Sequence, residues 1–489
     1  MTEEKSKSIF FWTLVALFFV TSTSLILYAF GYRFSPTRGV FVYGGSIMVK
    51  TTPQDANIYI NKQLMPSGKV SRLNNSVHID GIDPGEYTLE IKAAGFKTWS
   101  KKIAVHSGIS TEFWNIVLAK DSYAREDYNT PNIEKFFISP RKNLAAITQM
   151  EGDNFVVKVF DPSSLELKGV FAANDYVFTD NSKENIEWSP QAHRLIIPVI
   201  KKENGTKNYF ITTLDTGETI NLEGLVGEEN LSHVRWDPDT KNALFYMTGD
   251  RLMRIDLDAP TEKTQIAEKI ASYDLSSKGL FYFQLPEGIV YQTNFKGTDT
   301  PTQITSAAPQ DMSDPNFQLI VYDEKRIVMR NDNNGELYIF NEGKNDTYFE
   351  KLSSEAKGSQ FSDDGKKLLF WTDREISVYF AREWEVQPAR AENEKQLITR
   401  FAGEIKNVQW TRDYEHALFT IDKKIKMIEV DPRDHRNMDD VLSLADDSSI
   451  LVSNFSDGKL YFTEKDAGGQ TNLHSIYFPE RATFLGIQQ

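Results

Sequence analysis

A run of 25 residues near the N-terminus, from Ser8 to Tyr32, carries no charged side chain. A helix rises about 1.5 Å per residue, and about 20 apolar residues cross the hydrocarbon core of a bilayer. Residues 9–30 are therefore long enough to form one transmembrane helix behind a short cytoplasmic leader, residues 1–8. Trp12, Tyr28 and Tyr32 lie near the two ends of the run, where aromatic rings prefer the membrane interface.

The same run has two alternative interpretations, a cleaved signal peptide and a buried core helix. A signal peptide usually has a shorter apolar region that is followed by small residues at the cleavage site. Here the run is longer and ends with bulky side chains, among them Leu27, Tyr28 and Phe30. An uncleaved anchor is favoured, and it predicts a single-pass protein of the cell membrane.

The orientation of this span has little support from the flanking charges. Lys5 and Lys7 precede the span, whereas Arg33 and Arg38 follow it, so the positive-inside rule gives little bias. The short leader favours a signal anchor, which would place the large C-terminal part outside the cytoplasm. The chain has no cysteine, which is compatible with export and leaves no thiolate nucleophile, thiolate metal site or disulfide.

The composition of the remaining chain indicates a folded, β-rich protein. A net charge of −14 argues against a nucleic-acid partner, because such proteins concentrate Lys and Arg on their surface. The chain is rich in aromatic residues, and its Gly and Pro residues are spread along its length. This distribution is typical of many short strands joined by turns.

Residues 45–120 alternate between apolar and polar side chains with a period of two, which is typical of half-buried strands. We expect strands at 47–49, 58–60, 87–91, 103–105 and 113–118. The residues between them, such as 53–55, 61–62 and 83–86, are types that favour tight turns. A compact β-sandwich is predicted.

Residues 52–61 (TPQDANIYIN) and 84–99 (PGEYTLEIKAAGFKTW) resemble the PEGA domain. The chain departs from the family at 53–56, which read Pro-Gln-Asp-Ala, and it only loosely matches the family's central Gly-x-Thr-Pro element at 66–68. The resemblance implies a surface-associated β-module of bacteria or archaea beside a membrane anchor, with no catalytic residues. Phe96 is expected in the sandwich core, with Trp99 covering an edge.

Residues 123–489 repeat a unit of roughly 46 residues, the length of a four-stranded propeller blade. Each unit has an aromatic residue, a polar turn and an apolar strand, followed by a second strand. Six clear units begin near Phe137, Trp188, Trp236, Phe361, Trp410 and Phe455. Two weaker units lie near 273–283 and 321–328.

The motif resembles the WD40-like repeats of TolB-type β-propellers, so the fold class is all-β. About eight blades are expected, with seven as the alternative if one weak unit is an insertion, and residues 382–396 are expected to form a loop excursion. Stacked blades bury faces that one blade cannot bury alone. The aromatic residues that precede the turns are therefore predicted to be wedges between blades: Trp188, Trp236, Phe361, Trp410 and Phe455.

No motif in the chain predicts a catalytic, cofactor-binding or metal-binding residue, and no cofactor is expected. The histidines are scattered without metal-ligand spacing: His78, His106, His193, His233, His416, His435 and His474. The segment 332–336 has the wrong register for a calcium loop and is better explained by a hairpin turn. The polar segment 431–436 is interpreted as a solvated turn.

These features favour a membrane-anchored, non-catalytic binding or scaffolding protein that contacts envelope proteins or cell-wall glycan through its propeller. The alternative is an enzyme that acts on extracellular glycan or peptide, with its site in the propeller channel. Convergent buried carboxylates or a metal cluster at the channel mouth would favour the enzyme. A sensor is a third hypothesis, although the leader leaves almost no room for an output domain.

Overall fold

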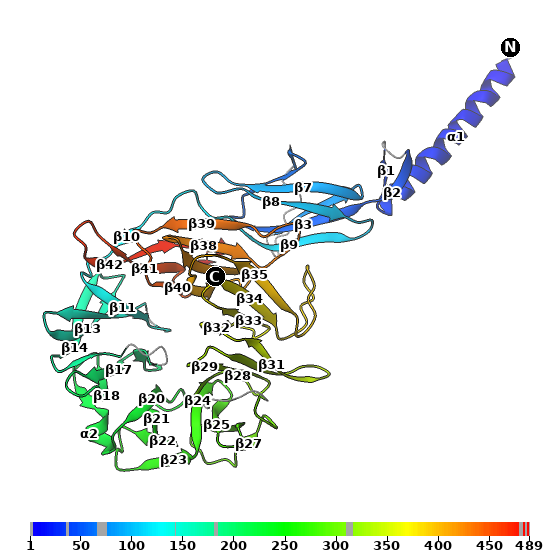
Figure 1. The fold of residues 1–489 in the computed structure, drawn as a ribbon. Helices are drawn as coiled ribbons and strands as arrows, with labels where there is room; N and C mark the ends of the chain where they lie inside the picture. Colours follow the sequence, from blue (N-terminus) through cyan, green and yellow to red (C-terminus); the bar gives the residue numbers. More distant parts are fainter. Residues whose placement is uncertain are drawn as a thin grey trace.

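A long helix stands apart from a folded head in the computed structural model, which describes residues 3–35, 39–65, 76–141, 143–179, 184–309, 316–478, 483–484 and 487–488 (Figure 1). The helix α1 (Glu3–Ala29) contains an apolar stretch, Lys7–Ala29, with a mean hydropathy of 2.1. None of this stretch is buried against protein. The core-helix interpretation is therefore wrong, and α1 is a candidate membrane anchor.

A short hairpin follows the helix, formed by β1 (Tyr32–Ser35) and β2 (Val40–Tyr43). The chain turns out of α1 at Gly31, whose φ of +90° is accessible to glycine at little cost. The Gly31 carbonyl then accepts a hydrogen bond from the backbone N–H of Gly44, at 3.1 Å. This bond fixes the base of the hairpin beside the end of the helix.

Two sheets packed face to face form the predicted β-sandwich. One sheet contains β6 (Val77–Ile82), β3 (Gly45–Thr52) and β9 (Ser110–Val117), in that order. The other contains β5 (Gln63–Leu64), β4 (Asn57–Ile60), β7 (Gly85–Lys92) and β8 (Trp99–Val105). Their inward side chains form one apolar core that includes Ile47, Leu89 and Trp99. The weak family element at 66–68 lies outside the described residues.

Eight sheets follow one another in the described part of residues 126–477, and we number them sheets 1 to 8. Sheet 1 comprises β11 (Ile133–Ile138), β12 (Ala145–Glu151), β13 (Asn154–Asp161) and β14 (Glu166–Ala173), and sheet 2 comprises β15 (Tyr176–Phe178), β16 (Glu187–Trp188), β17 (Arg194–Lys201), β18 (Lys207–Thr213) and β19 (Thr219–Asn221). Sheet 3 comprises β20 (Leu231–Trp236), β21 (Ala243–Thr248), β22 (Arg251–Asp256) and β23 (Lys263–Ala267), and sheet 4 comprises β24 (Ile270–Ser276), β25 (Gly279–Gln284), β26 (Ile289–Thr293) and β27 (Thr302–Gln303). The sheets surround a common centre, with β20 and β24 towards it and β14 and β23 at the outside (Figure 1).

Sheets 5 to 8 continue the same antiparallel pattern. Sheet 5 comprises β28 (Phe317–Asp323), β29 (Arg326–Asn331), β30 (Leu337–Glu342) and β31 (Thr347–Ser353), and sheet 6 comprises β32 (Gly358–Phe361), β33 (Lys367–Trp371), β34 (Glu375–Phe380) and β35 (Lys395–Arg400). Sheet 7 comprises β36 (Lys406–Trp410), β37 (His416–Ile421), β38 (Lys424–Glu429) and β39 (Met438–Ser443), and sheet 8 comprises β40 (Leu451–Asn454), β41 (Lys459–Lys465), β42 (Thr471–Tyr477) and β10 (Glu126–Asp127). A short helix, α2 (Leu222–Val226), follows β19, and β43 (Thr483–Phe484) pairs with β44 (Ile487–Gln488).

The sheets form a closed ring, which is the expected propeller. An apolar cluster lies between each pair of neighbouring sheets, including the pair formed by sheets 8 and 1. The ring closes because β10, from the start of the propeller, pairs with β42 near its end, with Glu126 opposite Ser475 and Asp127 opposite His474. The strand edge of the last sheet is therefore covered by its own chain.

Three of the five predicted wedges are buried indoles. Trp188, Trp236 and Trp410 lie in the apolar clusters between sheets. Phe361 and Phe455 are half-buried, yet each lies beside a tyrosine ring of the preceding sheet, and Phe361 also packs against the apolar cluster between sheets 5 and 6. A phenyl ring is smaller than an indole, so it leaves part of the same position open to solvent.

Two predicted loops are present as expected. Residues 382–394 form an excursion between β34 and β35 of one sheet, so this loop does not replace a blade unit. The segment 332–336 joins β29 to β30 in a hairpin, and Gly335 has a φ of +78° within it. The turn at Asn61 and Lys62 likewise has positive φ at both positions, as its residue types indicated.

Candidate functional site

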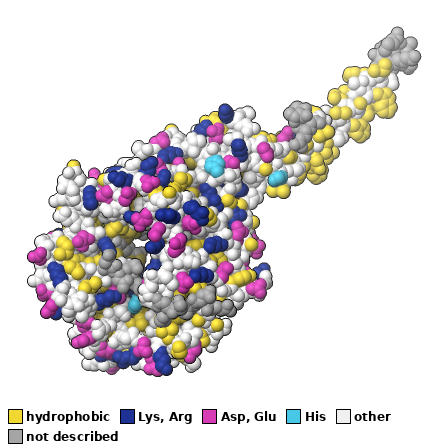
Figure 2. Space-filling model, viewed as in Figure 1, with side chains coloured by type: hydrophobic (Ala, Val, Ile, Leu, Met, Phe, Trp, Pro, Cys, Tyr) yellow, Lys and Arg dark blue, Asp and Glu magenta, His cyan; other side chains and the backbone are white. Residues whose placement is uncertain are grey.

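A cavity of about 630 Å³ opens in the centre of the ring, lined mainly by the innermost strands of sheets 1 to 5. Figure 2 shows the hollow in the face of the propeller. The strands β16, β20, β24 and β28 each contribute residues to this lining. The lining residues that carry charge are Glu184, Glu187, Arg235 and Asp274.

Arg235 connects two carboxylates across three neighbouring sheets. Its Nε lies 2.8 Å from Oε2 of Glu187, and its Nη1 lies 3.3 Å from Oδ1 of Asp274. The second carboxylate oxygens accept backbone N–H groups of the next sheet: Glu187 from Trp236 at 3.1 Å, and Asp274 from Val321 at 2.8 Å. These two carboxylates therefore also join the inner strands of neighbouring sheets.

Burial and neighbouring charges shift the pKa values of these groups. Burial raises the pKa of both Glu187 and Asp274, although Arg235 opposes the shift. The Glu187 carboxylate in turn raises the pKa of Arg235, whose side chain keeps 41% of its surface exposed. The arginine stays charged, and its exposed part faces the cavity.

A second polar group lies on the wall formed by sheet 2. The Oε1 atom of Glu184 accepts the backbone N–H of His233 at 3.3 Å, and its Oε2 lies 3.3 Å from Nζ of Lys207. The hydroxyl of Tyr209 is buried beside Glu184, and burial together with that carboxylate raises the pKa of the tyrosine.

His233 is placed by an irregularity in β20 that the sequence did not reveal. The pairing of β20 with β21 shifts register between Ser232 and Arg235, and His233 has a φ of +51°. Such a bulge re-aims the side chains around it. It brings His233, Val234 and Arg235 together onto the cavity wall.

Three of the histidines each pair with an aspartate. Among the described residues, no group of three or more His, Cys, Asp or Glu side chains could hold a metal ion. His416 is paired with Asp413 at 2.8 Å, His474 with Asp127 at 2.7 Å, and His435 with Asp434 at 2.9 Å. These pairs lie in three different parts of the propeller.

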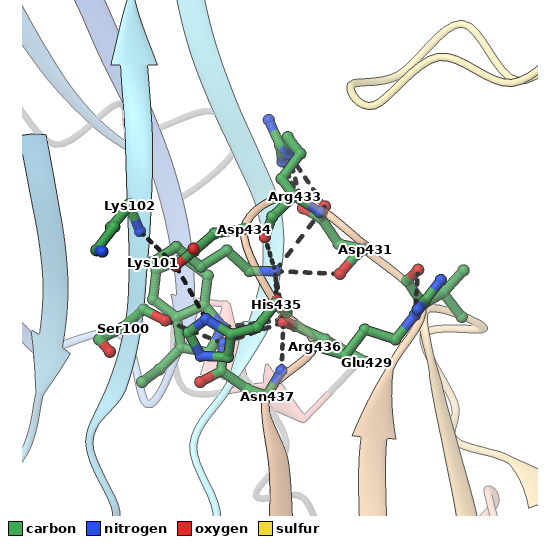
Figure 3. A network of polar contacts seen from close by, with 12 residues as sticks. Ser100, Lys101, Lys102, Glu429, Asp431, Arg433, Asp434, His435, Arg436 and Asn437 are labelled. Carbon is green, nitrogen blue, oxygen red and sulfur yellow. Dashed lines mark hydrogen bonds and ion pairs between the residues drawn. The ribbon is translucent and has the colours of Figure 1, made fainter. Parts of the chain in front are cut away.

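The segment 431–436 is predicted to be a solvated turn, and this holds only in part, because Asp434 and His435 are exposed while the rest of the loop is half-buried. This loop docks onto the β-sandwich, and Lys101 of β8 inserts its ammonium group into it (Figure 3). The Nζ atom of Lys101 donates to the carbonyl oxygens of Asp431, Arg433 and His435 at 3.1, 2.8 and 2.6 Å. It also lies 2.6 Å from Oε1 of Glu429, and the lysine side chain is fully buried.

Other contacts extend this clamp on both sides. The indole Nε1 of Trp99 donates to Oε2 of Glu429 at 2.9 Å, and the backbone N–H of Lys102 donates to Oδ2 of Asp434 at 2.8 Å. The guanidinium of Arg433 lies 3.9 Å from the centre of the Phe113 ring. The expected position of Trp99 is thus only half right, because its ring is in the core while its N–H reaches the propeller.

The excursion at 382–394 supplies a further contact. The Gln387 side chain donates to the carbonyl of Ser110 at 2.8 Å and accepts the N–H of Glu112 at 3.1 Å. The β-sandwich therefore contacts sheets 6 and 7, whereas the cavity is lined by sheets 1 to 5. The docked domain leaves the cavity lining free.

A signal for Lys101 was present in the sequence. Trp99, Lys101, Ile103 and Val105 alternate along β8 and share its inward face. A lysine at an apolar position of a strand needs a buried partner, because an unpaired charge is expensive to bury. The partner itself lies some 330 residues away along the chain, beyond the reach of any local pattern.

Comparison with known proteins gives one domain match and several propellers. No curated protein sequence matches this chain. Among solved structures, the chain is similar to the Dos1 propeller (TM-score 0.48, 10% identity, 72% of this chain and 95% of that one) and to the WD40 domain of SCAP from fission yeast (0.43, 12%, 73% and 98%). It is also similar to TolB from Acinetobacter baumannii (0.28, 13%, 65% and 60%). Residues 44–120 match the PEGA domain, which confirms the resemblance found in the sequence.

Proposed function

We propose that this chain is a membrane-anchored, non-catalytic scaffolding protein that holds a binding propeller outside the cytoplasm, where it contacts envelope proteins or cell-wall glycan. The observation that carries the proposal is the position of the β-sandwich. It is clamped to sheets 6 and 7 through Lys101 and Gln387, and none of the described residues that line the cavity on sheets 1 to 5 belongs to it. A propeller that is fixed beside its anchor through sheets that do not line the cavity is suited to presenting that cavity to a partner.

The chemistry of the cavity supports binding rather than catalysis. Both carboxylates next to Arg235 are engaged by the guanidinium and by backbone N–H groups, so neither faces the cavity as an isolated acid or base. Apolar and aromatic walls with a few placed polar and charged groups, as in this cavity, are typical of ligand sites. Extended polar chains, such as glycan strands or peptide segments, have the hydrogen-bonding groups that these walls can pair.

The proposal is tested by photo-crosslinking from the cavity in cells that express the full chain. A photoreactive amino acid at Gln318, on the cavity wall, is expected to form crosslinks to an envelope protein or to cell-wall glycan. The matched control is the same amino acid at Leu165, an exposed position on sheet 1 outside the cavity lining. Equal products from both positions, or none from either, would contradict binding through the cavity.

The location of the head is tested by protease treatment of spheroplasts. The propeller is expected to be cut by external protease while a cytoplasmic marker protein stays intact. A propeller that becomes accessible only after lysis would contradict the extracytoplasmic orientation.

An enzyme that acts on glycan or peptide is the second candidate, because burial raises the pKa of two carboxyl groups in one cavity. If this candidate were right, Glu187→Gln and Asp274→Asn would each abolish turnover of a glycan or peptide substrate. Under the scaffolding proposal, the full-length protein shows no turnover that depends on these two side chains. Assays of wall fragments and of peptide libraries separate the two candidates.

A further inference from the structure

One face of the hairpin formed by β1 and β2 is entirely aromatic. In its register Tyr32 lies opposite Tyr43, and Phe34 lies opposite Phe41, so that these four side chains share a face. The ring centres of the two pairs are 5.3 and 5.5 Å apart. Each of the four residues exposes between 38% and 55% of its surface.

An aromatic face of this kind is unusual on a protein surface that is exposed only to water. A two-stranded hairpin alone is at best marginally stable in water, and contiguous exposed apolar patches mark interaction sites. The opposite face carries Arg33, whose guanidinium stacks 3.8 Å from the centre of the Tyr28 ring and donates to the Tyr28 carbonyl at 2.9 Å. Arg33 thereby ties the hairpin to the last turn of α1, and the aromatic face on the other side keeps much of its surface exposed.

The other end of the hairpin is fixed to the β-sandwich. The Tyr43 carbonyl accepts a hydrogen bond from Oγ of Ser107 at 2.7 Å, and the Tyr43 ring is flanked by two glycines. A Cβ on Gly31 would lie 2.7 Å from the ring, and a Cβ on Gly108 would lie 2.5 Å from it. Close backbone approach on both sides holds the hairpin in one place between helix and head.

The position of the hairpin beside the end of α1 indicates that its aromatic face contacts the membrane. The residues of α1 from Lys7 to Ala29 reach about 35 Å at 1.5 Å per residue, which is slightly more than the roughly 30 Å hydrocarbon core. The hairpin begins three residues later and lies beside the end of the helix, so it falls at the level of the lipid headgroups (Figure 1). Figure 2 shows hydrophobic side chains along the helix and again where the helix joins the rest of the molecule.

We propose that the aromatic face of Tyr32, Phe34, Phe41 and Tyr43 inserts into the interfacial layer of the bilayer, next to the end of the transmembrane helix. Aromatic rings are favoured there because one part of the ring meets acyl chains while the polar part stays hydrated. The hairpin gives the anchor a second contact with the membrane and restricts the tilt of the head. This inference rests on the membrane anchoring of α1 in the proposed function.

The absence of cysteine from the chain allows a direct test with single spin labels. The full chain is reconstituted into vesicles of phosphatidylcholine and phosphatidylglycerol, with one label at Phe34→Cys or Phe41→Cys. Power saturation then compares collisions of the label with oxygen, which concentrates in the bilayer, and with a water-soluble nickel complex. Both labels are expected to favour oxygen over nickel, at a depth near the headgroups.

Three further spin labels distinguish a failure of the hairpin insertion from a failure of the membrane anchoring. Leu17→Cys reports the helix centre, Leu165→Cys reports the exposed surface of sheet 1, and Val40→Cys reports the opposite face of the same hairpin. Labels at 34 and 41 that behave like the one at 165, while the one at 17 is oxygen-rich, would overturn the insertion of the hairpin alone. A label at 17 that also behaves like the one at 165 would overturn the membrane anchoring on which the inference rests. Equal depths at 34 and 40 would contradict the one-sided contact of the aromatic face.

Discussion

At the scale of single residues, the recurring tryptophans show why the repeat could be found in the sequence. Each indole N–H donates to a backbone carbonyl in the preceding sheet: Trp188 to Phe137 at 3.0 Å, Trp236 to Glu187 at 3.2 Å, and Trp410 to Gln360 at 3.0 Å. A buried indole needs a partner for its N–H, and every sheet offers the same carbonyl. The equivalent phenylalanines have no N–H and are less buried.

The buried pair of His416 and Asp413 is expected to make stability depend on pH. Burial alone would lower the pKa of His416, but Asp413 outweighs it and raises this pKa above 6.5. Burial alone would raise the pKa of Asp413, but His416 and Thr411 lower it to about 2. The pair therefore stabilises the fold when both groups are charged.

The sign of each contribution follows from the direction of its pKa shift. The stabilisation from His416 is fully present below its unfolded pKa, near 6.5, and is lost as the pH rises through the higher folded pKa. The stabilisation from Asp413 is present above about pH 4 and is lost as the pH falls towards 2. His416→Gln should therefore reduce the free energy of unfolding most near pH 5.5, by about 3 kcal/mol for a broken buried pair, and progressively less at higher pH.

Urea unfolding between pH 4.5 and 9 checks this expectation. His106→Gln is the matched control, because His106 is exposed on the β-sandwich. A loss of stability for His416→Gln that is constant over this range would show that the imidazole acts through packing and not through charge.

At the scale of elements, the ring depends on a strand of only two residues. Around β10, Nζ of Lys459 lies 2.5 Å from Oε2 of Glu126, and the hydroxyl of Tyr128 lies 2.8 Å from Oγ of Ser475. The Tyr128 ring is buried between sheets 8 and 1, where it contacts the rings of Phe160 and Tyr461. Packing and side-chain bonds around the strand therefore supplement the few ladder hydrogen bonds that so short a strand provides.

Tyr128→Ala is expected to open this closure. The change removes a buried aromatic ring and its hydroxyl, which typically costs about 3–5 kcal/mol. Amide hydrogen exchange followed by mass spectrometry should speed up first in β42 and β11, the strands on either side of the closure. Leu397→Ala, an exposed position on β35 away from the closure, is the control and should leave these rates unchanged. Faster exchange spread evenly over all sheets would mean that the closure is not a local unit.

At the scale of the whole molecule, Lys101 holds the two folded parts together. Lys101→Met removes the cation that pairs with the buried Glu429 carboxylate and the donor to three carbonyls, and the indole of Trp99 and the amide of Asn437 remain as neutral donors to Glu429. Removing one partner of a buried ion pair costs about 3–5 kcal/mol, and here the loss falls on the docking of the β-sandwich. Hydrogen exchange should accelerate in residues 97–105 and 429–437 and stay unchanged in sheets 2 to 4.

Lys102→Met is the matched control for this prediction. The Lys102 side chain is exposed, and only its backbone N–H bonds to Asp434. The control should exchange like the natural protein. If both variants behave alike, the ammonium group of Lys101 does not hold the interface.

The sequence by itself determined the features that repeat or that depend on neighbours along the chain. An uncharged run long enough to span a bilayer, period-two strands with turn residues, and an aromatic residue before each blade turn are local patterns, so the helix, the β-sandwich and the propeller could be predicted. The turn at Asn61 and Lys62 and the hairpin at Gly335 follow from backbone preferences of the residues themselves.

Only the tertiary structure decided which distant residues meet. The contact of Lys101 with the 431–435 carbonyls, the Arg235 bridge between Glu187 and Asp274, and the pairing of β10 with β42 each join segments from different parts of the chain. The bulge that places His233 and Arg235 arises from strand pairing and leaves no signal in composition. Local preferences act within a few residues, whereas these contacts are set by the ring geometry that brings the segments together.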